Sequence, residues 1–166
     1  QTVRRVRGAF GDQVAVLHSG LSDGERADAW RLLRRGERRV AVGARSALFA
    51  PIPDLGVIVV DEEHEASYKN GEAPRYQARD VAAVRGRLEG ARLILGSATP
   101  AVETWARATS GKLTLVTLPV RIGERPLPPV EVVDLRSAAR VKESGAIPWS
   151  AALDAAVDRV IARKEQ

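Results

Sequence analysis

The chain has 166 residues, of which 45% are hydrophobic and 28% are charged, and it contains no cysteine. This composition indicates one globular unit with an apolar core, and it excludes a wholly disordered chain, disulfide bonds and cysteine metal sites. No apolar run approaches the roughly 20 residues of a membrane-spanning helix, and the first residues lack the apolar core of a signal peptide. We therefore expect a soluble, cytoplasmic protein.

The net charge of +5 arises in the first third of the chain. Residues 1–48 hold ten basic residues against five acids, whereas residues 49–166 hold sixteen of each. A basic face of this kind can attract a phosphate backbone. A solvated helix end explains the same arginines equally well, so charge alone leaves nucleic-acid binding open. The arginines concerned are Arg34, Arg35, Arg38 and Arg39.

Helix and strand patterns alternate in the first part of the chain. In order, they predict a helix over residues 2–10, a strand over 14–17, a helix that begins with the capping pair Ser22 and Glu25, and a strand over 39–42. This alternation is typical of an α/β fold with a mainly parallel sheet flanked by helices on both faces.

A turn rich in small residues follows at 43–51. Gly43 would let the backbone approach a ligand closely, and Arg45 with Ser46 could hold a phosphate between guanidinium, hydroxyl and amide donors. A helix cap whose arginine pairs with a nearby acid explains these residues equally well. The turn alone therefore leaves both interpretations open.

Residues 57–60 are four apolar residues, three of them valine, and they predict a short central strand covered on both faces. Asp61, Glu62, Glu63 and His64 follow directly, at the carboxyl end of that strand. In this position one carboxylate can bind Mg²⁺ while its neighbour orients or deprotonates a water, as nucleotide hydrolysis requires. On its own, an acidic turn after a strand is more often a solvated loop.

The polar segment 66–79 holds two tyrosines beside cations, in a chain with only three tryptophans, two tyrosines and two phenylalanines. Tyr68, Lys69, Arg75 and Tyr76 suggest base stacking combined with phosphate contact. Anchoring of the loop to the core by its tyrosines is an equally good explanation.

Further elements follow in the same alternating order. Residues 96–100 are small, and some of them carry a hydroxyl group. Because they follow the end of a predicted strand, they could meet the acidic cluster from the end of that neighbouring strand. The patterns predict a helix over 79–89 that Gly90 closes, a strand over 92–95, a helix over 102–109 and a strand over 113–118.

Beyond residue 118 the chain changes character, since residues 119–129 carry four of the nine prolines. We interpret residues 119–147 as a connector that contains a short alternating strand over 130–134. Apolar residues at helical spacing predict a last helix over 153–161.

The order of these motifs resembles that of superfamily 2 helicases. Residues 61–64 resemble motif II, and Ser97, 36 positions after Asp61, opens a stretch that resembles motif III. The match becomes closer in the strings at 18–22, 42–51, 67–69, 75–80 and 96–100, which together resemble the primosomal replication-restart helicase family PriA. The resemblance covers nearly the whole chain.

The resemblance implies a domain organisation. Residues 1–118 would form most of a RecA-like P-loop NTPase lobe that is incomplete at its amino terminus, and residues 148–166 would begin a second lobe. No Gly-x-x-x-x-Gly-Lys-Ser/Thr loop occurs in the sequence, so the usual cradle for the β- and γ-phosphates is missing. We therefore expect an internal fragment that does not hydrolyse ATP by itself.

The resemblance also implies a function: an ATP-dependent 3′-to-5′ DNA helicase that acts in replication restart at stalled forks and in primosome assembly. Asp61 would hold Mg²⁺, Glu62 would activate the water that attacks the γ-phosphate of ATP, and His64 would couple this step to DNA. The nucleotide state would be relayed by Gly96, Ser97, Ala98 and Thr99. Single-stranded DNA would be contacted by Gly43, Arg45, Ser46, Tyr68, Lys69, Arg75, Tyr76 and Arg79.

The family further implies ATP and Mg²⁺ as cofactors, and a zinc whose cysteine ligands are not in this chain. Its partners would be single-stranded and branched fork DNA, primosome proteins and single-stranded-DNA-binding protein, at the nucleoid and without a membrane. One departure is Ala44, which stands where the family usually has threonine, so one hydroxyl for a DNA backbone contact is lost. A helicase-like scaffold that binds branched DNA without turning over ATP is the alternative function.

Overall fold

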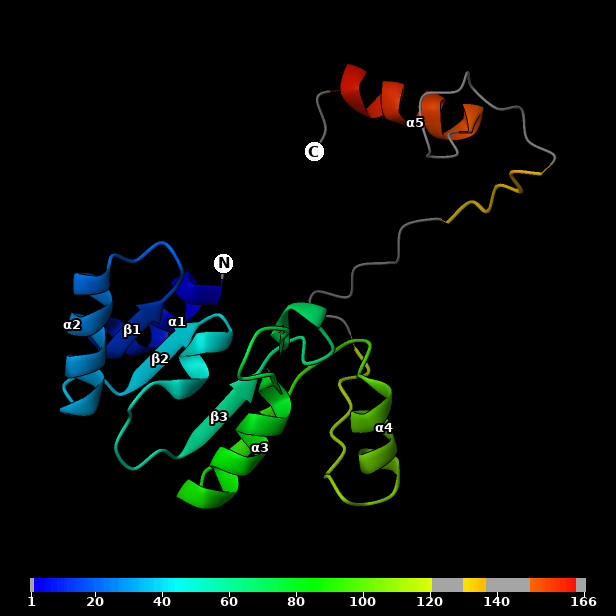
Figure 1. Ribbon diagram of the computed structural model, residues 1–166. Coiled ribbons are helices and arrows are strands. Elements are labelled where there is room, and N and C mark those ends of the chain that lie inside the picture. The colour runs from blue at the N-terminus through cyan, green and yellow to red at the C-terminus, as the bar shows by residue number, and fades with distance from the viewer. Residues whose placement is uncertain (1, 121–129, 137–149, 164–166) are drawn as a thin grey trace. The chain divides into compact units, whose positions relative to one another are not determined.

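The computed structural model describes residues 2–120, 130–136 and 150–163 (Figure 1). The chain divides into two compact units, Gln1–Val116 and Thr117–Gln166. The described part of the second unit contains helix α5 (Ala151–Ala162), which confirms the last predicted helix. The Ser150 hydroxyl caps it by accepting a hydrogen bond from the amide of Leu153 at 3.1 Å. Most of the predicted connector, residues 121–129 and 137–147, lies outside the described residues.

The first unit is built from two strand–helix–strand repeats. In the first repeat, helix α2 (Asp23–Arg34) connects β1 (Val14–Leu17) to β2 (Val40–Gly43). In the second, β3 (Val57–Val60) and β6 (Arg92–Leu95) are connected by a crossover that contains α3 (Ala78–Glu89). Both strand pairs are parallel. Parallel strands need such a crossover connection. Each repeat therefore forms its own two-stranded parallel sheet. This arrangement of strands and helices confirms the predicted α/β class.

Shorter elements complete the first unit. Helix α1 (Thr2–Phe10) leads into the 3-10 turn η1 (Gly11–Gln13), and α4 (Val102–Thr109) follows β6. A two-stranded antiparallel hairpin lies between β3 and α3. Its elements are the 3-10 turn η3 (Ala66–Tyr68), β4 (Lys69–Asn70) and β5 (Tyr76–Gln77). No helix in the described ranges is both long and apolar enough to cross a membrane.

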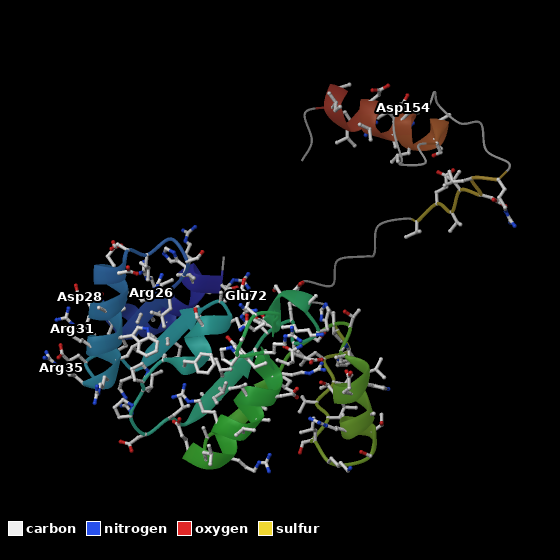
Figure 2. All side chains as sticks on the ribbon, in the orientation of Figure 1. Arg26, Asp28, Arg31, Arg35, Glu72 and Asp154 are labelled. Carbon is white, nitrogen blue, oxygen red and sulfur yellow. The ribbon has the colours of Figure 1, made fainter. Side chains whose placement is uncertain are left out.

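The helix ends follow from local sequence signals. The amide of Glu25 donates to the Ser22 hydroxyl at 3.3 Å, and the amide of Ser22 donates to the Glu25 carboxylate at 2.9 Å, so the predicted capping box of α2 is confirmed. Gly90 ends α3 in the left-handed conformation, with φ of 68°, as expected for a helix-terminating glycine. Charged side chains on one side of α2 and at its carboxyl end are labelled in Figure 2: Asp28 and Arg31 in the helix, and Arg35 at its C-cap.

Within the residues that the structure describes, the single continuous sheet that the alternation suggested is not formed. The pairs β1–β2 and β3–β6 are separate sheets, and the chain between β2 and β3 forms the 3-10 helix η2 (Arg45–Phe49) and a loop. Arg85 of α3 joins the two repeats. Its guanidinium donates to the carbonyl of Ala50 at 2.9 Å and also to the carbonyl of Leu48.

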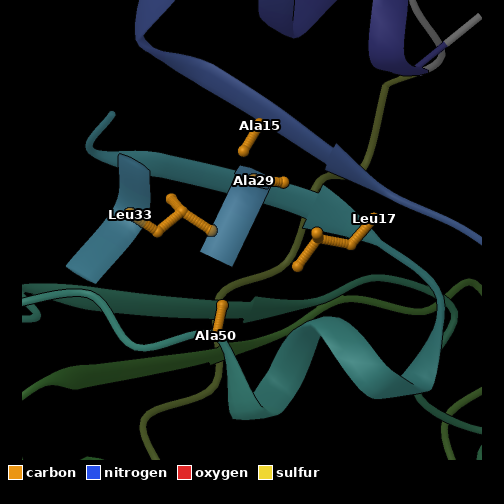
Figure 3. Packing of buried hydrophobic residues seen from close by; sticks show 5 residues of the cluster. All are labelled: Ala15, Leu17, Ala29, Leu33 and Ala50. Atoms are coloured by element: carbon orange, nitrogen blue, oxygen red, sulfur yellow. The ribbon is translucent and has the colours of Figure 1, made fainter. Parts of the chain in front are cut away.

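The buried core of the first repeat is small. Its residues come from β1, from α2 and from the end of η2, and they pack together beneath the β1–β2 pair (Figure 3). Leu33 is its largest fully buried apolar side chain. The cluster consists of Ala15, Leu17, Ala29, Leu33 and Ala50.

The strand β3 is covered on one face only, so the predicted burial on both faces is wrong. Helix α3 packs on β3 and β6, and a Cβ on its Gly86 would come within 4.0 Å of Leu93, which identifies the covered face. On the opposite face Val57 and Val59 of β3 and Ile94 of β6 are exposed, Val59 by 61%. An apolar run has the same sequence pattern whether one or both faces are covered, and this pattern misled the prediction.

Two further predicted strands are not formed. Residues 113–118 and 130–134 have no strand structure, and their apolar side chains are largely exposed. An apolar or alternating run becomes a strand only when a neighbouring strand supplies hydrogen-bond partners. Within the described residues neither segment has such a neighbour.

The side chain of Glu63 connects three elements of the second repeat. It is 1% exposed, and it accepts hydrogen bonds from the amide of Ala101 at 2.7 Å, the hydroxyl of Thr104 at 3.0 Å and the guanidinium of Arg79 at 3.1 Å. Burial acts to raise the pKa of Glu63, but these hydrogen bonds outweigh it and the pKa is lowered. Arg79 also pairs with Glu103 at 3.0 Å. The end of β3 is thereby tied to the first turns of α3 and α4.

Gly43 generates a prediction about stability. A Cβ at this position would lie 2.0 Å from the carbonyl oxygen of Leu17, its partner in the β1–β2 register. We expect Gly43→Ala to lower the free energy of unfolding by at least about 1–3 kcal/mol, because the backbone itself must move to admit the methyl group. Urea unfolding followed by circular dichroism measures this change. Gly24→Ala is the control, since its Cβ would point into open space within α2; equal effects of both variants would contradict the prediction.

Glu63 generates a prediction about pH. Its folded-state pKa is lowered, so the stability that it contributes is present above the unfolded-state value of about 4.3 and is lost as the pH falls through the folded-state pKa. Glu63→Gln should cost about 1–3 kcal/mol near pH 7, with a smaller difference from wild type below pH 4 or so. Urea unfolding between pH 3 and pH 7 tests this. The control is Glu72→Gln, an exposed carboxylate (Figure 2), which should leave the curve of wild type almost unchanged.

Candidate functional site

The candidate site begins where β3 ends. Asp61 and Glu62 are exposed, whereas the next side chain, Glu63, turns into the protein. Glu62 has a positive φ of 48°, a conformation that costs a residue other than glycine about 1–3 kcal/mol. A carboxylate oxygen of Asp61 accepts a hydrogen bond from the amide of Glu62 at 3.1 Å and helps to hold this turn. The turn therefore presents two adjacent carboxylates to solvent.

The ends of β3 and β6 are held together by backbone hydrogen bonds. The amide of Gly96 donates to the carbonyl of Val60 at 2.9 Å, and the amide of Glu63 donates to the carbonyl of Gly96 at 3.0 Å. A Cβ on Gly96 would lie 3.3 Å from the Asp61 carboxylate, which is closer than side chains normally pack. The absence of a side chain at position 96 thus leaves room for the carboxylate of Asp61.

His64 lies against the hydroxyl residues that follow β6. Its Nδ1 is 2.7 Å from Oγ of Ser97, and its Nε2 is 3.4 Å from Oγ1 of Thr99. Oγ of Ser97 also accepts a hydrogen bond from the Thr99 amide at 3.0 Å, so its own hydrogen can be donated to Nδ1. The structure therefore brings together the hydroxyl residues and the acidic cluster, as the sequence suggested; Ala98 between them is exposed.

His64 also contacts the second acid of the cluster. Its Nδ1 lies 3.6 Å from a carboxylate oxygen of Glu62, whose side chain is largely exposed. The same ring nitrogen thus lies near both Glu62 and Ser97, while Nε2 lies near Thr99.

The two tyrosines of segment 66–79 make internal contacts. The hydroxyl of Tyr68 donates to the carbonyl of Asp61 at 3.0 Å, and burial together with the charges of Asp61 and Glu62 raises the pKa of Tyr68. The ring of Tyr76 meets Phe49 edge to face, with ring centroids 5.4 Å apart. Of the two explanations that the sequence left open, the structure shows the anchoring contacts.

Arg45 joins the two loops that were predicted to contact DNA. Its guanidinium donates to the carbonyl of Lys69 at 2.7 Å and to that of Ser67 at 3.4 Å, and it lies 5.5 Å from the centre of the Tyr76 ring. Within the described part of the chain, Arg45 thus contacts carbonyls and an aromatic ring, not the nearby acid that a simple cap would pair with. Ser46 beside it is exposed.

The hairpin encloses an open hollow of about 420 Å³. The side chains of Lys69 and Arg75 are exposed at its rim, and Tyr76 contributes to its wall. The amide side chain of Asn70 donates to the carbonyls of Glu72 and Pro74, at 3.2 and 2.8 Å, and so holds the hairpin turn. The hollow combines two cations with an aromatic ring on a well-held turn.

Arg79 is placed differently from the other predicted DNA contacts. Its side chain is 14% exposed and pairs with Glu63 and Glu103. Burial acts to lower the pKa of Arg79, but the hydrogen bonds to both carboxylates outweigh it and raise the pKa. Sequence analysis did not single out Glu63, its buried partner. The two residues are 16 positions apart, and no local signal pairs them.

The residues present fit a metal that is shared with a nucleotide. Within the described residues no group of three or more His, Cys, Asp or Glu side chains could hold a metal ion. Magnesium is commonly held by one or two carboxylates together with substrate phosphates and waters. The exposed carboxylate of Asp61 suits that arrangement. The described residues do not suit a site in which protein side chains supply all the metal ligands.

Similar proteins cover the whole chain. No protein-family model matches it. It is 47% identical over 166 residues to replication restart protein PriA of Bacillus subtilis (strain 168), and 43% identical over 171 residues to PriA of a Synechocystis species; each match covers 100% of this chain and 20% of the relative. PriA of Chlamydia pneumoniae is 48% identical over 122 residues, which are 73% of this chain and 16% of that protein. The chain thus spans about a fifth of the length of these curated relatives. With such identity across its full length, and with the motif order described above, the chain belongs to the PriA family of replication restart proteins.

Proposed function

We propose that this chain carries the water-activating and DNA-coupling part of an ATP-dependent 3′-to-5′ DNA helicase that acts in replication restart and primosome assembly. The name of its relatives gives the process. The observation that supports the chemistry best is the contact of 2.7 Å between His64 and Ser97, which joins the acidic cluster to the hydroxyl loop. The segment would belong to a RecA-like P-loop NTPase lobe.

In this proposal Asp61 and Glu62 have separate tasks. Asp61 would hold Mg²⁺ together with the phosphates of ATP, and the bound metal would neutralise charge that develops on the phosphoryl oxygens. Glu62 is exposed beside it, and its carboxylate would orient the attacking water and take its proton. The phosphate cradle would come from another segment of the longer protein, because this sequence contains no glycine-rich phosphate loop.

DNA would bind at the hairpin hollow. Lys69 and Arg75 would contact phosphates, and Tyr76 would offer its ring to a base or sugar. Binding of DNA would shift Arg45, because its guanidinium donates a hydrogen bond to the backbone carbonyl of Lys69. Tyr68 would transmit this shift to the acidic cluster, since its hydroxyl donates a hydrogen bond to the backbone carbonyl of Asp61.

The alternative is a helicase-like scaffold that binds branched DNA without ATP turnover. The observation in its favour is the lack of a phosphate loop in these 166 residues. The exposed pair Asp61 and Glu62 and the His64–Ser97 contact favour the enzyme, since a scaffold has no need of them.

The first test concerns Glu62. In the full-length protein, Glu62→Gln should retain ATP binding and lower DNA-stimulated hydrolysis by a factor of about 10²–10⁴, because the amide cannot accept the proton of the attacking water. Phosphate release and binding of a fluorescent ATP analogue measure the two quantities. Glu37→Gln, an exposed carboxylate beside Arg35, is the control. Full turnover in Glu62→Gln would defeat the assignment, and absence of hydrolysis in wild type would support the scaffold.

The second test concerns the hairpin. Replacement of Lys69 or Arg75 by alanine should weaken binding of single-stranded DNA and reduce the slope of log affinity against log salt concentration by about 0.7 for each lost phosphate contact. Fluorescence anisotropy of a labelled oligonucleotide at several salt concentrations gives this slope. Arg87→Ala removes an exposed cation from α3 and serves as the control. An unchanged slope in both hairpin variants would place the DNA elsewhere.

A further inference from the structure

Among the four residues 61–64, Glu63 alone has a buried side chain. The carboxylates of Asp61 and Glu62 and the ring of His64 have the roles proposed above, and Glu63 has none of them. Its two carboxylate oxygens are both used: Oε1 accepts from the amide of Ala101, and Oε2 accepts from Arg79 and from Thr104. A single carboxylate therefore holds the first turn of α3 and the first turn of α4.

The helix α4 depends on these bonds for its position. None of its residues is buried; Val102 is 81% exposed and Trp105 is 49% exposed. Apolar packing therefore locates this helix only in part. The polar contacts at its start are the hydrogen bonds of Ala101 and Thr104 to Glu63 and the pairing of Glu103 with Arg79.

Arg79 connects the same carboxylate to the hairpin. It lies two residues after the end of β5, in the first turn of α3. A shift of the hairpin on DNA binding would move this turn, and the guanidinium would pass the shift to Oε2 of Glu63 at 3.1 Å. Oε2 is shared with Thr104, so the shift would reach α4 directly.

The geometry points to Glu63 as a positioning residue that transmits the state of the hairpin to α4 and to its neighbours Glu62 and His64. The inference rests on the proposed function in one respect, that DNA binds at the hairpin. Stability alone is a weak reason for this arrangement, because a buried ion pair often stabilises a fold no more than apolar residues of similar size. A carboxylate that bonds two helix starts also fixes their relative position.

The experiment uses the full-length protein and a single-stranded oligo(dT) at saturation. Hydrogen–deuterium exchange of residues 101–109 is measured with and without DNA, and ATP hydrolysis is measured in parallel. In wild type, DNA should change exchange in α4. In Glu63→Gln, which still binds the oligonucleotide, this change should be lost and the DNA stimulation of hydrolysis should fall by about fivefold or more.

Two further variants separate transmission from folding. Thr104→Val keeps the Glu63–Arg79 pair and the side-chain shape but removes the hydroxyl donor, so it should weaken the response of α4 even if Glu63→Gln does not fold. Glu103→Gln removes the charge of the exposed partner of Arg79, since the Glu103 side chain is 67% exposed. The change in α4 exchange on DNA binding should remain in this variant.

The outcomes distinguish the inference from the proposed function. If DNA leaves exchange in α4 of wild type unchanged, or if Thr104→Val and Glu63→Gln respond as wild type does, Glu63 has a structural role only and the inference is wrong. If wild type shows the response and Thr104→Val loses it, the inference holds, even when no ATP hydrolysis is detected and the proposed enzyme is ruled out.

Discussion

The arrangement of the site depends on one buried carboxylate. Removing a charged group from water is costly unless polar partners replace its hydration, and Glu63 meets this condition with three donors, one at the start of α3 and two at the start of α4. Because those donors are fixed by the carboxylate, the end of β3 and the starts of α3 and α4 form one rigid junction. Asp61 and Glu62 are exposed to solvent next to that junction. Their orientation therefore depends on Glu63, to which we assign no part in the chemical step.

Close backbone approaches set a second constraint. Gly43 is required because β1 and β2 approach too closely for a Cβ, which gives a structural reason for a residue that sequence analysis assigned to ligand contact. Gly96 leaves space for the carboxylate of Asp61. Gly43 thus allows the close pairing of β1 with β2, and Gly96 makes room for a side chain of the candidate site. The same residue type, at the carboxyl ends of two strands, has two different physical reasons.

Local signals in the sequence were reliable and pairings were not. The capping box at Ser22 and the closing glycine at position 90 depend on neighbouring residues, so helix positions could be predicted closely. The sequence suggested that residues 96–100 could meet the acidic cluster, and the contact of His64 with Ser97 is one such meeting. The partners of Arg79 and Arg45 lie 16 to 24 positions away in the sequence, and no local pattern pairs them. The separation of the two sheets was missed for the same reason. Anchoring by Tyr68 was one of two explanations that the sequence left open.

The uncovered face of β3 and β6 has a practical consequence. Val57, Val59 and Ile94 form an apolar strip on a short parallel pair, and exposed strips of this kind promote association between molecules. A preparation of these 166 residues alone should therefore be prone to self-association at high concentration. Mild detergent or a polar replacement at Val59 would reduce this tendency, since Val59 is the most exposed side chain of the strip.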